Sequence, residues 1–236
     1  MAVQPKGKKK LESGIAGTYQ TETGVKMKVP YAFRGSLMGR EEIKAVEDVI
    51  LHNETLTMGP HTTGFQKEFA EFCGVKHALT CSNCTTAMHI CTQLFGIGPG
   101  DEVIVTPNTF VATSLVVVKE GGRCVYADID PRTLNIDPAE VKKKITKRTK
   151  AIYVVHFGGQ MVDMDPIMAL AKKHNLFVLE DCAHAPGAEY KGRKAGTIGH
   201  VGCFSFHSLK NMSTCEGGMV TTNADRIAKE VQNLRC

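Results

Sequence analysis

The sequence predicts an α/β fold, a three-layer α/β/α sandwich built on a mainly parallel, seven-stranded sheet. Two observations lead to this prediction. Short apolar segments alternate along the chain with segments that repeat apolar residues at helical spacing, a pattern typical of parallel sheets covered by helices. A chain of 236 residues, 42% of them hydrophobic, is also long enough to bury one large core.

The predicted elements begin after residue 39. Apolar residues at helical spacing predict a helix over 40–52, and phenylalanines at positions 65, 69 and 72 predict another. Seven strands are expected at 77–81, 102–106, 123–129, 151–156, 176–180, 201–206 and 218–222. Helices are expected near 85–95, 109–119, 138–144 and 166–174. The link between the last two strands is too short for a crossover helix, so the last strand is expected to run antiparallel.

Residues 1–34 are expected to form a basic tail and lead-in. Residues 1–28 hold six lysines and two glutamates, which is +4 of the net charge of +5, so only +1 remains for the rest. A nucleic-acid-binding face is therefore not expected. No apolar run of about 18 residues predicts a membrane span, and no secretory signal follows Met1. We expect a cytoplasmic protein with no membrane partner.

Nine cysteines without an export signal indicate reduced thiols rather than disulfides. Cys81 and Cys84 form the only close pair. A zinc site would need a second pair at matching spacing, and a thioredoxin-like redox motif is the other alternative at this strand-to-helix turn. We expect ordinary packing thiols in preference to both, and no metal site.

Three reactive side chains follow or end consecutive predicted strands. Asp181 follows the strand at 176–180, Ser205 lies near the end of the next strand, and Lys210 comes shortly after it. Ligands collect at the carboxyl ends of parallel strands, so these side chains are expected to share a pocket. Separately, Asp181 could merely cap a turn and Lys210 could be a solvated lysine. Together they suit a pyridoxal phosphate (PLP) site, where a lysine bonds to the cofactor and an acid partners its pyridinium nitrogen.

A phosphate site is predicted independently of the lysine. The strand at 77–81 runs into Ser82 and Asn83, and a helix is expected to begin near Thr85 and Thr86. Amides and hydroxyls at a helix N-terminus attract phosphate, although a polar cap without a ligand is commoner. No dinucleotide or nucleoside-triphosphate glycine motif occurs in the chain.

Two aromatic side chains are further candidates for cofactor contacts. Phe110 follows the strand at 102–106 and could stack on a planar ring, or could simply belong to the core. His184, three residues after Asp181, could donate to the phenolic side of the cofactor or hold Asp181 in place.

From residue 35 to its end the chain resembles the nucleotide-sugar aminotransferases of the DegT/DnrJ/StrS type, which are PLP enzymes. The resemblance rests on motifs that occur in the same order as in that family. They lie at 57–60, 82–85, 107–113, 128–130, 156–160, 180–185, 204–211 and 216–219.

The resemblance implies roles for the candidate residues. Lys210 would bond to PLP and shuttle a proton, and Asp181 would keep the pyridine nitrogen protonated. Thr85, the amide of Thr86 and Ser205 would bind the phosphate. Phe110 occupies the position that stacks on the ring, and His184 occupies a position that is glutamine in many relatives.

The implied reaction transfers an amino group from glutamate or glutamine to a nucleotide-linked keto-sugar, in the biosynthesis of amino sugars. His184 and the segment 205–210 are more similar to members that aminate C4 than C3. A homodimer is also implied. One alternative is a sugar dehydratase of the same fold, but those relatives tend to have histidine in place of Lys210. Another is a non-catalytic module that keeps the cofactor pocket.

Two departures from the family pattern stand out. Cys84 occupies a position where many relatives have glycine or alanine. Residues 35–236 correspond to the large, PLP-binding domain, and the smaller C-terminal domain of the family is expected to be absent from this chain.

Overall fold

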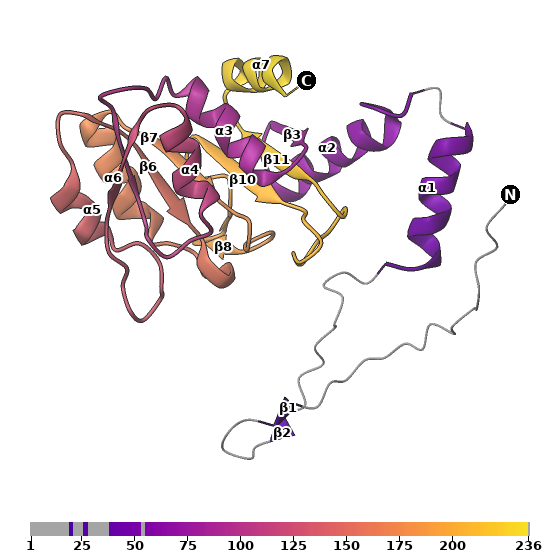
Figure 1. The fold of residues 1–236 in the computed structure, drawn as a ribbon, viewed down its shortest axis with the longest axis horizontal. Helices are drawn as coiled ribbons and strands as arrows, with labels where there is room; N and C mark the ends of the chain where they lie inside the picture. The colour runs from indigo at the N-terminus through magenta and orange to yellow at the C-terminus, as the bar shows by residue number, and fades with distance from the viewer. Residues whose placement is uncertain (1–18, 21–25, 28–37, 53–54, 236) are drawn as a thin grey trace, which may run out of the picture.

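The computed structural model describes residues 19–20, 26–27, 38–52 and 55–235. Its centre is a sheet of seven strands, which confirms the predicted fold class (Figure 1). The strands are β3 (His77–Cys81), β4 (Glu102–Val105), β5 (Arg123–Tyr126), β6 (Thr149–Val155), β7 (Phe177–Asp181), β10 (Val201–Ser205) and β11 (Gly218–Thr222). They pair in the order β3-β11-β10-β7-β6-β4-β5. β11 runs antiparallel to both of its neighbours, β3 and β10, as the short connection before it predicts, and the other strands of the sheet all run in one direction.

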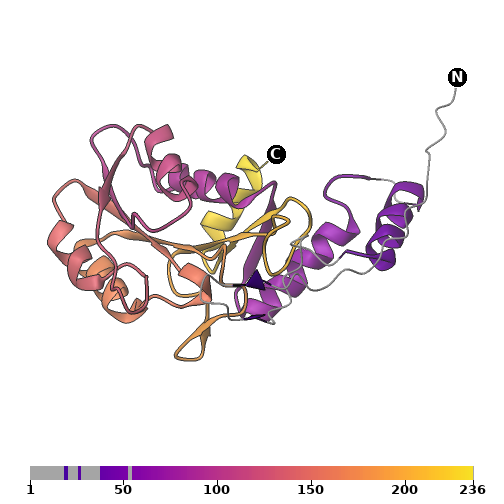
Figure 2. The ribbon, with the colours of Figure 1, turned by 60° about the horizontal axis from the view of Figure 1, so that its bottom comes forward.

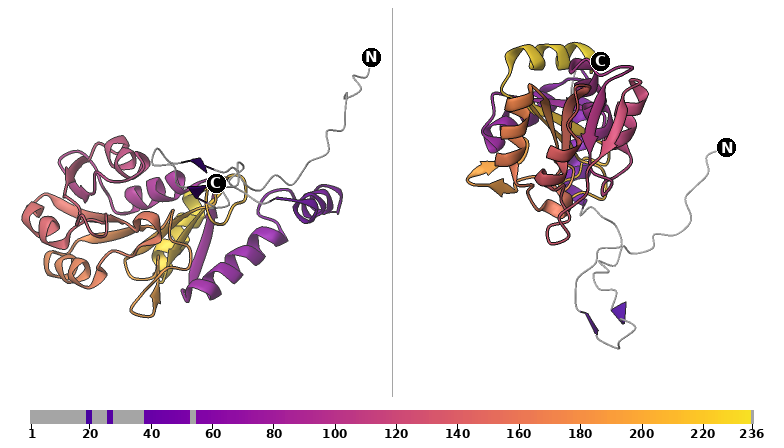
Figure 3. Two further views of the ribbon diagram at one scale, coloured as in Figure 1. Left: turned by 90° about the horizontal axis from the view of Figure 1, so that it is seen from below. Right: turned by 90° about the vertical axis from the view of Figure 1, so that its left-hand side faces the viewer.

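Helices cover both faces of the sheet (Figure 3). Residues of α2 (Pro60–Cys73), α5 (Pro138–Lys144) and α6 (Met164–His174) share one buried cluster. Residues of α3 (Cys84–Leu94), α4 (Ala112–Lys119) and α7 (Asp225–Leu234) share another. Side chains alternate along each strand, so Ile152 and Val154 of β6 enter the first cluster while Ala151 and Tyr153 enter the second. The sheet therefore separates two apolar cores.

Helix α1 (Arg40–His52) occurs at the predicted residues but has no buried residue, and it lies apart from the sandwich (Figure 2). Strands β1 (Tyr19–Gln20) and β2 (Lys26–Met27) pair within the predicted tail, most of which lies outside the described residues. No helix in the described part of the chain has the length and apolar character needed to cross a membrane.

Several element boundaries differ from the prediction. Strand β5 ends at Tyr126 because the chain then turns, and Ile129 makes an isolated bridge with Ile136. Helix α4 begins at Ala112 rather than near 109. Helix α7 and the small hairpin of β8 (Glu189–Tyr190) and β9 (Arg193–Lys194) were not among the predicted elements. Residues Phe157–Gly159 form a short 3-10 turn, η1.

Strand β11 approaches the start of α3 so closely that only glycine fits at its first position. A Cβ atom on Gly218 would lie 2.3 Å from the carbonyl carbon of Asn83 and 2.7 Å from the backbone nitrogen of Cys84. Both contacts are with backbone, which cannot rotate away. Gly218 thus lets the sheet support the turn between β3 and α3.

We expect Gly218→Ala to lower the free energy of unfolding by roughly 3 kcal/mol, because the extra methyl group forces backbone apart in a packed region. Urea denaturation measures the effect. Gly98→Ala is the matched control, since its Cβ would meet nothing within 4 Å. Equal stability of the two variants would contradict the close approach.

Candidate functional site

A cavity of about 470 Å³ lies at the carboxyl ends of the parallel strands. Its lining includes residues from the β3–α3 turn, the β4–α4 turn, the end of β7 and the segment after β10. Six of the seven residues predicted for the site line it: Thr85, Phe110, Asp181, His184, Ser205 and Lys210. The predicted convergence at one edge of the sheet is therefore present in the structure.

Asp181 is the last residue of β7, and its carboxylate is buried at the base of this cavity with 3% exposure. One carboxylate oxygen, Oδ1, accepts from the N–H of Ala183 at 3.1 Å, which caps the following turn. The other, Oδ2, accepts from the Thr113 hydroxyl at 2.8 Å. The turn-capping alternative is thus correct for one oxygen only, and the carboxylate still lines the cavity.

Lys210 is carried by a loop that folds back on the sheet after β10. Its N–H donates to the carbonyl of His207 at 2.9 Å. Both ends of the loop are fixed, because Phe206 N–H donates to Gly217 O and Thr214 N–H donates to Phe206 O. Ser205, the last residue of β10, is buried beside the cavity. The loop therefore brings the amine of Lys210 over the ends of the strands.

The N-terminus of α3 forms the third side of the cavity. Asn83 caps the helix, and its side-chain oxygen accepts from the N–H of Thr86 at 2.8 Å. Thr85 lines the cavity, whereas Thr86 does not. The Thr86 amide is accordingly already paired in this structure, unlike the free donor that the sequence suggested.

Cys84, the first residue of α3, is buried, and burial raises the pKa of its thiol well above the usual value, with the charge of Lys210 opposing part of the shift. Burial also raises the pKa of Cys81 to about 12. The Cys81 thiol donates to the carbonyl of Leu79, and both cysteines belong to the same apolar cluster. Both thiols are thus packed in the apolar core on this side of the sheet.

His184 is held by the 3-10 turn η1. The N–H of Gly158 donates to its Nδ1 at 3.3 Å, and the Phe157 ring packs edge-on at 5.7 Å between centroids. Because Nδ1 accepts, the proton of the neutral ring is on Nε2. Burial, and then the nearby charge of Lys210, lower the pKa of His184. The ring therefore presents a neutral N–H donor at the cavity.

A buried carboxylate lies immediately before Asp181. Glu180 has no exposed surface, and its carboxylate accepts four hydrogen bonds within the described structure. The donors are His156 Nε2 at 2.9 Å, Gly196 N–H at 3.0 Å, Ile198 N–H at 2.7 Å and Gly199 N–H at 2.6 Å. His156, Glu180 and Cys182 lie close enough together to resemble a metal ligand set. Both carboxylate oxygens of Glu180, however, already accept two hydrogen bonds each.

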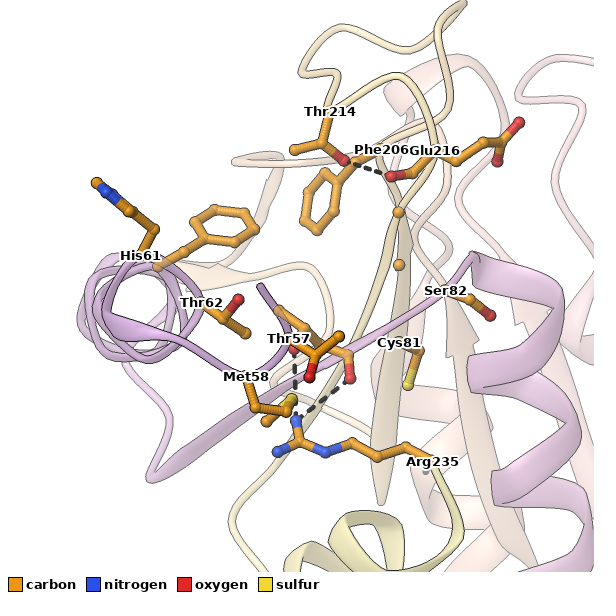
Figure 4. Close-up of a pocket in the computed structure, with 14 residues that line it drawn as sticks. Thr57, Met58, His61, Thr62, Cys81, Ser82, Phe206, Thr214, Glu216 and Arg235 are labelled. Atoms are coloured by element: carbon orange, nitrogen blue, oxygen red, sulfur yellow. Dashed lines mark hydrogen bonds between the residues drawn. The ribbon is translucent and has the colours of Figure 1, made fainter. Parts of the chain in front are cut away.

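A second, larger cavity of about 740 Å³ adjoins the first, and Glu216 lines both (Figure 4). Its walls come from the start of α2, the end of β3 and the loop before β11. Arg235 lies across its base and donates from Nη1 to both oxygens of Thr80 and to Gln66. Figure 4 shows Phe206 and Thr62 facing this space and His61 turned outward.

Four residues that shape the site lie in motifs that carried the resemblance, but no local pattern assigned them a role: Thr113, Asn83, Glu180 and His156. Thr113 was hidden because a threonine inside an apolar helix gives no periodic signal. The helix-cap preference of asparagine could have identified Asn83. The contacts of Glu180 with residues 196–199 are long-range, so no local pattern indicates them.

The sequence model of the DegT/DnrJ/EryC1/StrS aminotransferase family matches residues 36–236, which is most of the chain. The chain belongs to this family. Its members are PLP-dependent aminotransferases, as the site chemistry indicated.

Two curated relatives and one solved structure illustrate the similarity. The spore coat polysaccharide biosynthesis protein SpsC of Bacillus subtilis is 47% identical over 87% of this chain and 52% of its own length. GDP-perosamine synthase of Caulobacter vibrioides is 49% identical over 76% of this chain and 48% of its own length. The structure of an aminotransferase from Psychrobacter cryohalolentis is 45% identical and has a TM-score of 0.82. The match covers 86% of this chain and 52% of that protein. The chain spans about half the length of the curated relatives it matches.

We expect His184 to titrate below its ordinary value of 6.5, because burial and Lys210 disfavour the charged ring. Stability from this neutral histidine is complete above pH 6.5 and is lost as the pH falls through the folded-state pKa. An NMR titration of the ring signals measures the shift, and His184→Gln identifies the signal by its loss. A midpoint at or above 6.5 would contradict the placement of the ring.

Proposed function

We propose that the protein transfers an amino group from glutamate or glutamine to a nucleotide-linked keto-sugar, using PLP held in the cavity between Asp181 and Lys210. The observation that carries the proposal is that a buried carboxylate, an amine and two hydroxyls converge on one cavity. Residues 35–236 would then be the cofactor-binding domain, as the sequence suggests. Biosynthesis of amino sugars for polysaccharides is the corresponding pathway class.

The residues present fit PLP in size and chemistry. A volume of about 470 Å³ lies within the usual range of small-molecule sites. Thr85 and Ser205 offer hydroxyls to a phosphate at the N-terminus of α3, where the helix dipole favours an anion. Phe110 is 71% exposed at the edge of the cavity, so a planar ring can reach its face. Its exposure also excludes the buried-core alternative for this side chain.

Bound PLP supplies an electron-withdrawing ring on which an amino group can be carried. Asp181 would hold a proton on the ring nitrogen, because a buried carboxylate stabilises an adjacent positive charge. His184 lines the cavity and could donate from Nε2 to an oxygen of the cofactor. Its neutral state avoids a second positive charge beside Lys210.

Lys210 has two tasks in the proposed reaction. Its amine would hold the cofactor in the cavity, and the same amine is placed to move a proton to or from the reacting carbon. The loop 207–216 allows both, since it is pinned at its ends while Lys210 lies between them. Similarity to GDP-perosamine synthase supports a nucleotide-linked substrate, and His184 with the segment 205–210 suggests amination at C4. The Thr86 amide could join the phosphate ligands if the Asn83 side chain turned aside.

A homodimer is the second part of the proposal, supported by an apolar stripe beside the cavity. The stripe consists of three exposed apolar residues at helical spacing, Val111 at the start of α4 and Leu115 and Val118 within it. Phe110 extends the same patch toward the cavity. Exposed apolar patches of this kind are typical of protein–protein contact sites. A second copy would cover this patch and help close the cavity.

Reduction of the PLP-loaded protein with borohydride should fix the cofactor to the peptide that contains Lys210, because among the described residues it is the only lysine that lines the cavity. Mass spectrometry of peptides locates the label. Lys191 is an internal control: its bond to Asp165 raises its pKa and keeps it protonated, so it should stay unlabelled. Lys210→Ala should lose the label completely. A label on Lys191 instead, or none, would refute the assignment.

Leu115→Glu should convert the dimer to a monomer, because it places a charge in the centre of the apolar stripe. Sedimentation velocity distinguishes the two states. Lys142→Glu introduces the same side chain on α5, on the opposite face of the sheet, and should leave the dimer intact. A monomeric parent protein, or a dimer that survives Leu115→Glu, would argue against this interface.

A further inference from the structure

Thr113 is a buried hydroxyl with a direct bond to the acid of the site. It lies in the first turn of α4, has no exposed surface, and its Oγ1 is 2.8 Å from Oδ2 of Asp181. The same oxygen is 2.8 Å from Oγ1 of Thr109, which lines the cavity. Two threonines therefore form a short chain of hydroxyls that ends on the carboxylate.

The direction of this chain follows from counting protons. A threonine hydroxyl has one proton to donate, and a carboxylate can only accept. Thr113 also lies 3.3 Å from the carbonyl of Phe110, but the carboxylate is closer and charged, so the proton points to Asp181. Thr109 must then donate its own proton to Thr113. Each hydroxyl in the series polarises the next.

We propose that Thr113, supported by Thr109, is a positioning residue that fixes Oδ2 of Asp181 and keeps the shared proton on the ring nitrogen of the cofactor. This role rests on the proposed function of the cavity. The Ala183 amide fixes the other oxygen, so the two bonds together set the plane of the carboxylate. Sequence motifs indicated Asp181 and Lys210 but gave Thr113 no role.

The physical reason is competition for one proton between a carboxylate and a pyridine nitrogen. A hydrogen bond donated to the carboxylate stabilises its charged form and weakens it as a base. Without the Thr113 hydroxyl, Oδ2 of Asp181 would lose its donor, and only the Ala183 amide would orient the carboxylate. Both changes move the proton away from the ring nitrogen, so they act in the same direction.

The test compares Thr113→Val, which keeps the shape and removes the hydroxyl, with Thr113→Ser, which keeps the hydroxyl. PLP labelled with ¹⁵N at the ring nitrogen is added to each variant of the 236-residue chain. In Thr113→Val we expect the ¹⁵N signal to move toward that of an unprotonated ring. The dissociation constant of PLP should rise about tenfold, the usual scale for a bond to a charged group. Thr113→Ser should restore both values.

A matched control separates this role from ordinary core packing. Thr92 is also a fully buried helical threonine, but its hydroxyl bonds to Met88 and Tyr153, away from the cavity. Thr92→Val should leave the ¹⁵N signal unchanged even if it lowers stability. If Thr113→Val does not fold, Thr109→Val provides the measurement, because it removes only the outer hydroxyl and should shift the signal in the same direction by less.

The outcomes distinguish the inference from the function on which it rests. Failure of the parent protein to bind PLP would overturn the proposed function, and the role of Thr113 with it. Binding by the parent, with the same ¹⁵N signal and affinity in the valine variant that folds, would overturn the role of Thr113 alone. An equal shift in Thr92→Val would also overturn it, since packing would then explain the effect.

Discussion

The buried carboxylate of Glu180 is the interaction on which the geometry of the site depends. A fully buried charge is tolerated only when hydrogen bonds replace its hydration, and Glu180 obtains these from His156 and from the turn at 196–199. His156 in turn begins the segment whose Gly158 amide orients His184. One side chain at the end of β7 thereby ties together the loops on its two sides.

Successive side chains of a strand point to opposite faces, so Glu180 and Asp181 meet different surroundings although they are adjacent in sequence. Glu180 points to the side where it meets backbone amides, while Asp181 faces the cavity and meets Thr113. The two carboxylates share a strand without sharing an environment. Because Glu180 anchors the backbone, Asp181 starts from a rigid position, and a reactive group held by a rigid strand needs little reorganisation when charge develops nearby.

Much of this molecule was predictable from local patterns, and the remainder depends on long-range contacts. All seven strands and the antiparallel β11 follow from apolar periodicity and connection length, and the strand-end rule placed Asp181, Ser205 and Lys210 together. Helix α7 was predictable from Ile227, Ala228 and Val231 but was overlooked. The pairing of the Thr86 amide with Asn83, and the bond from Thr113 to Asp181, depend on side-chain geometry that no spacing encodes.

The place of β3 in the sheet has a consequence for how the protein is made. β3 is the first strand of the sheet in the sequence, yet its only strand neighbour is β11, the last, with Cys81 opposite Gly218. Pairing of distant segments is slow because a long loop must close first. During synthesis β3 therefore has no strand partner within this sheet until β11 has left the ribosome. The turn between β3 and α3, against which Gly218 packs, is supported only after β11 has paired, so the cavity beside it takes its shape after the sheet is complete.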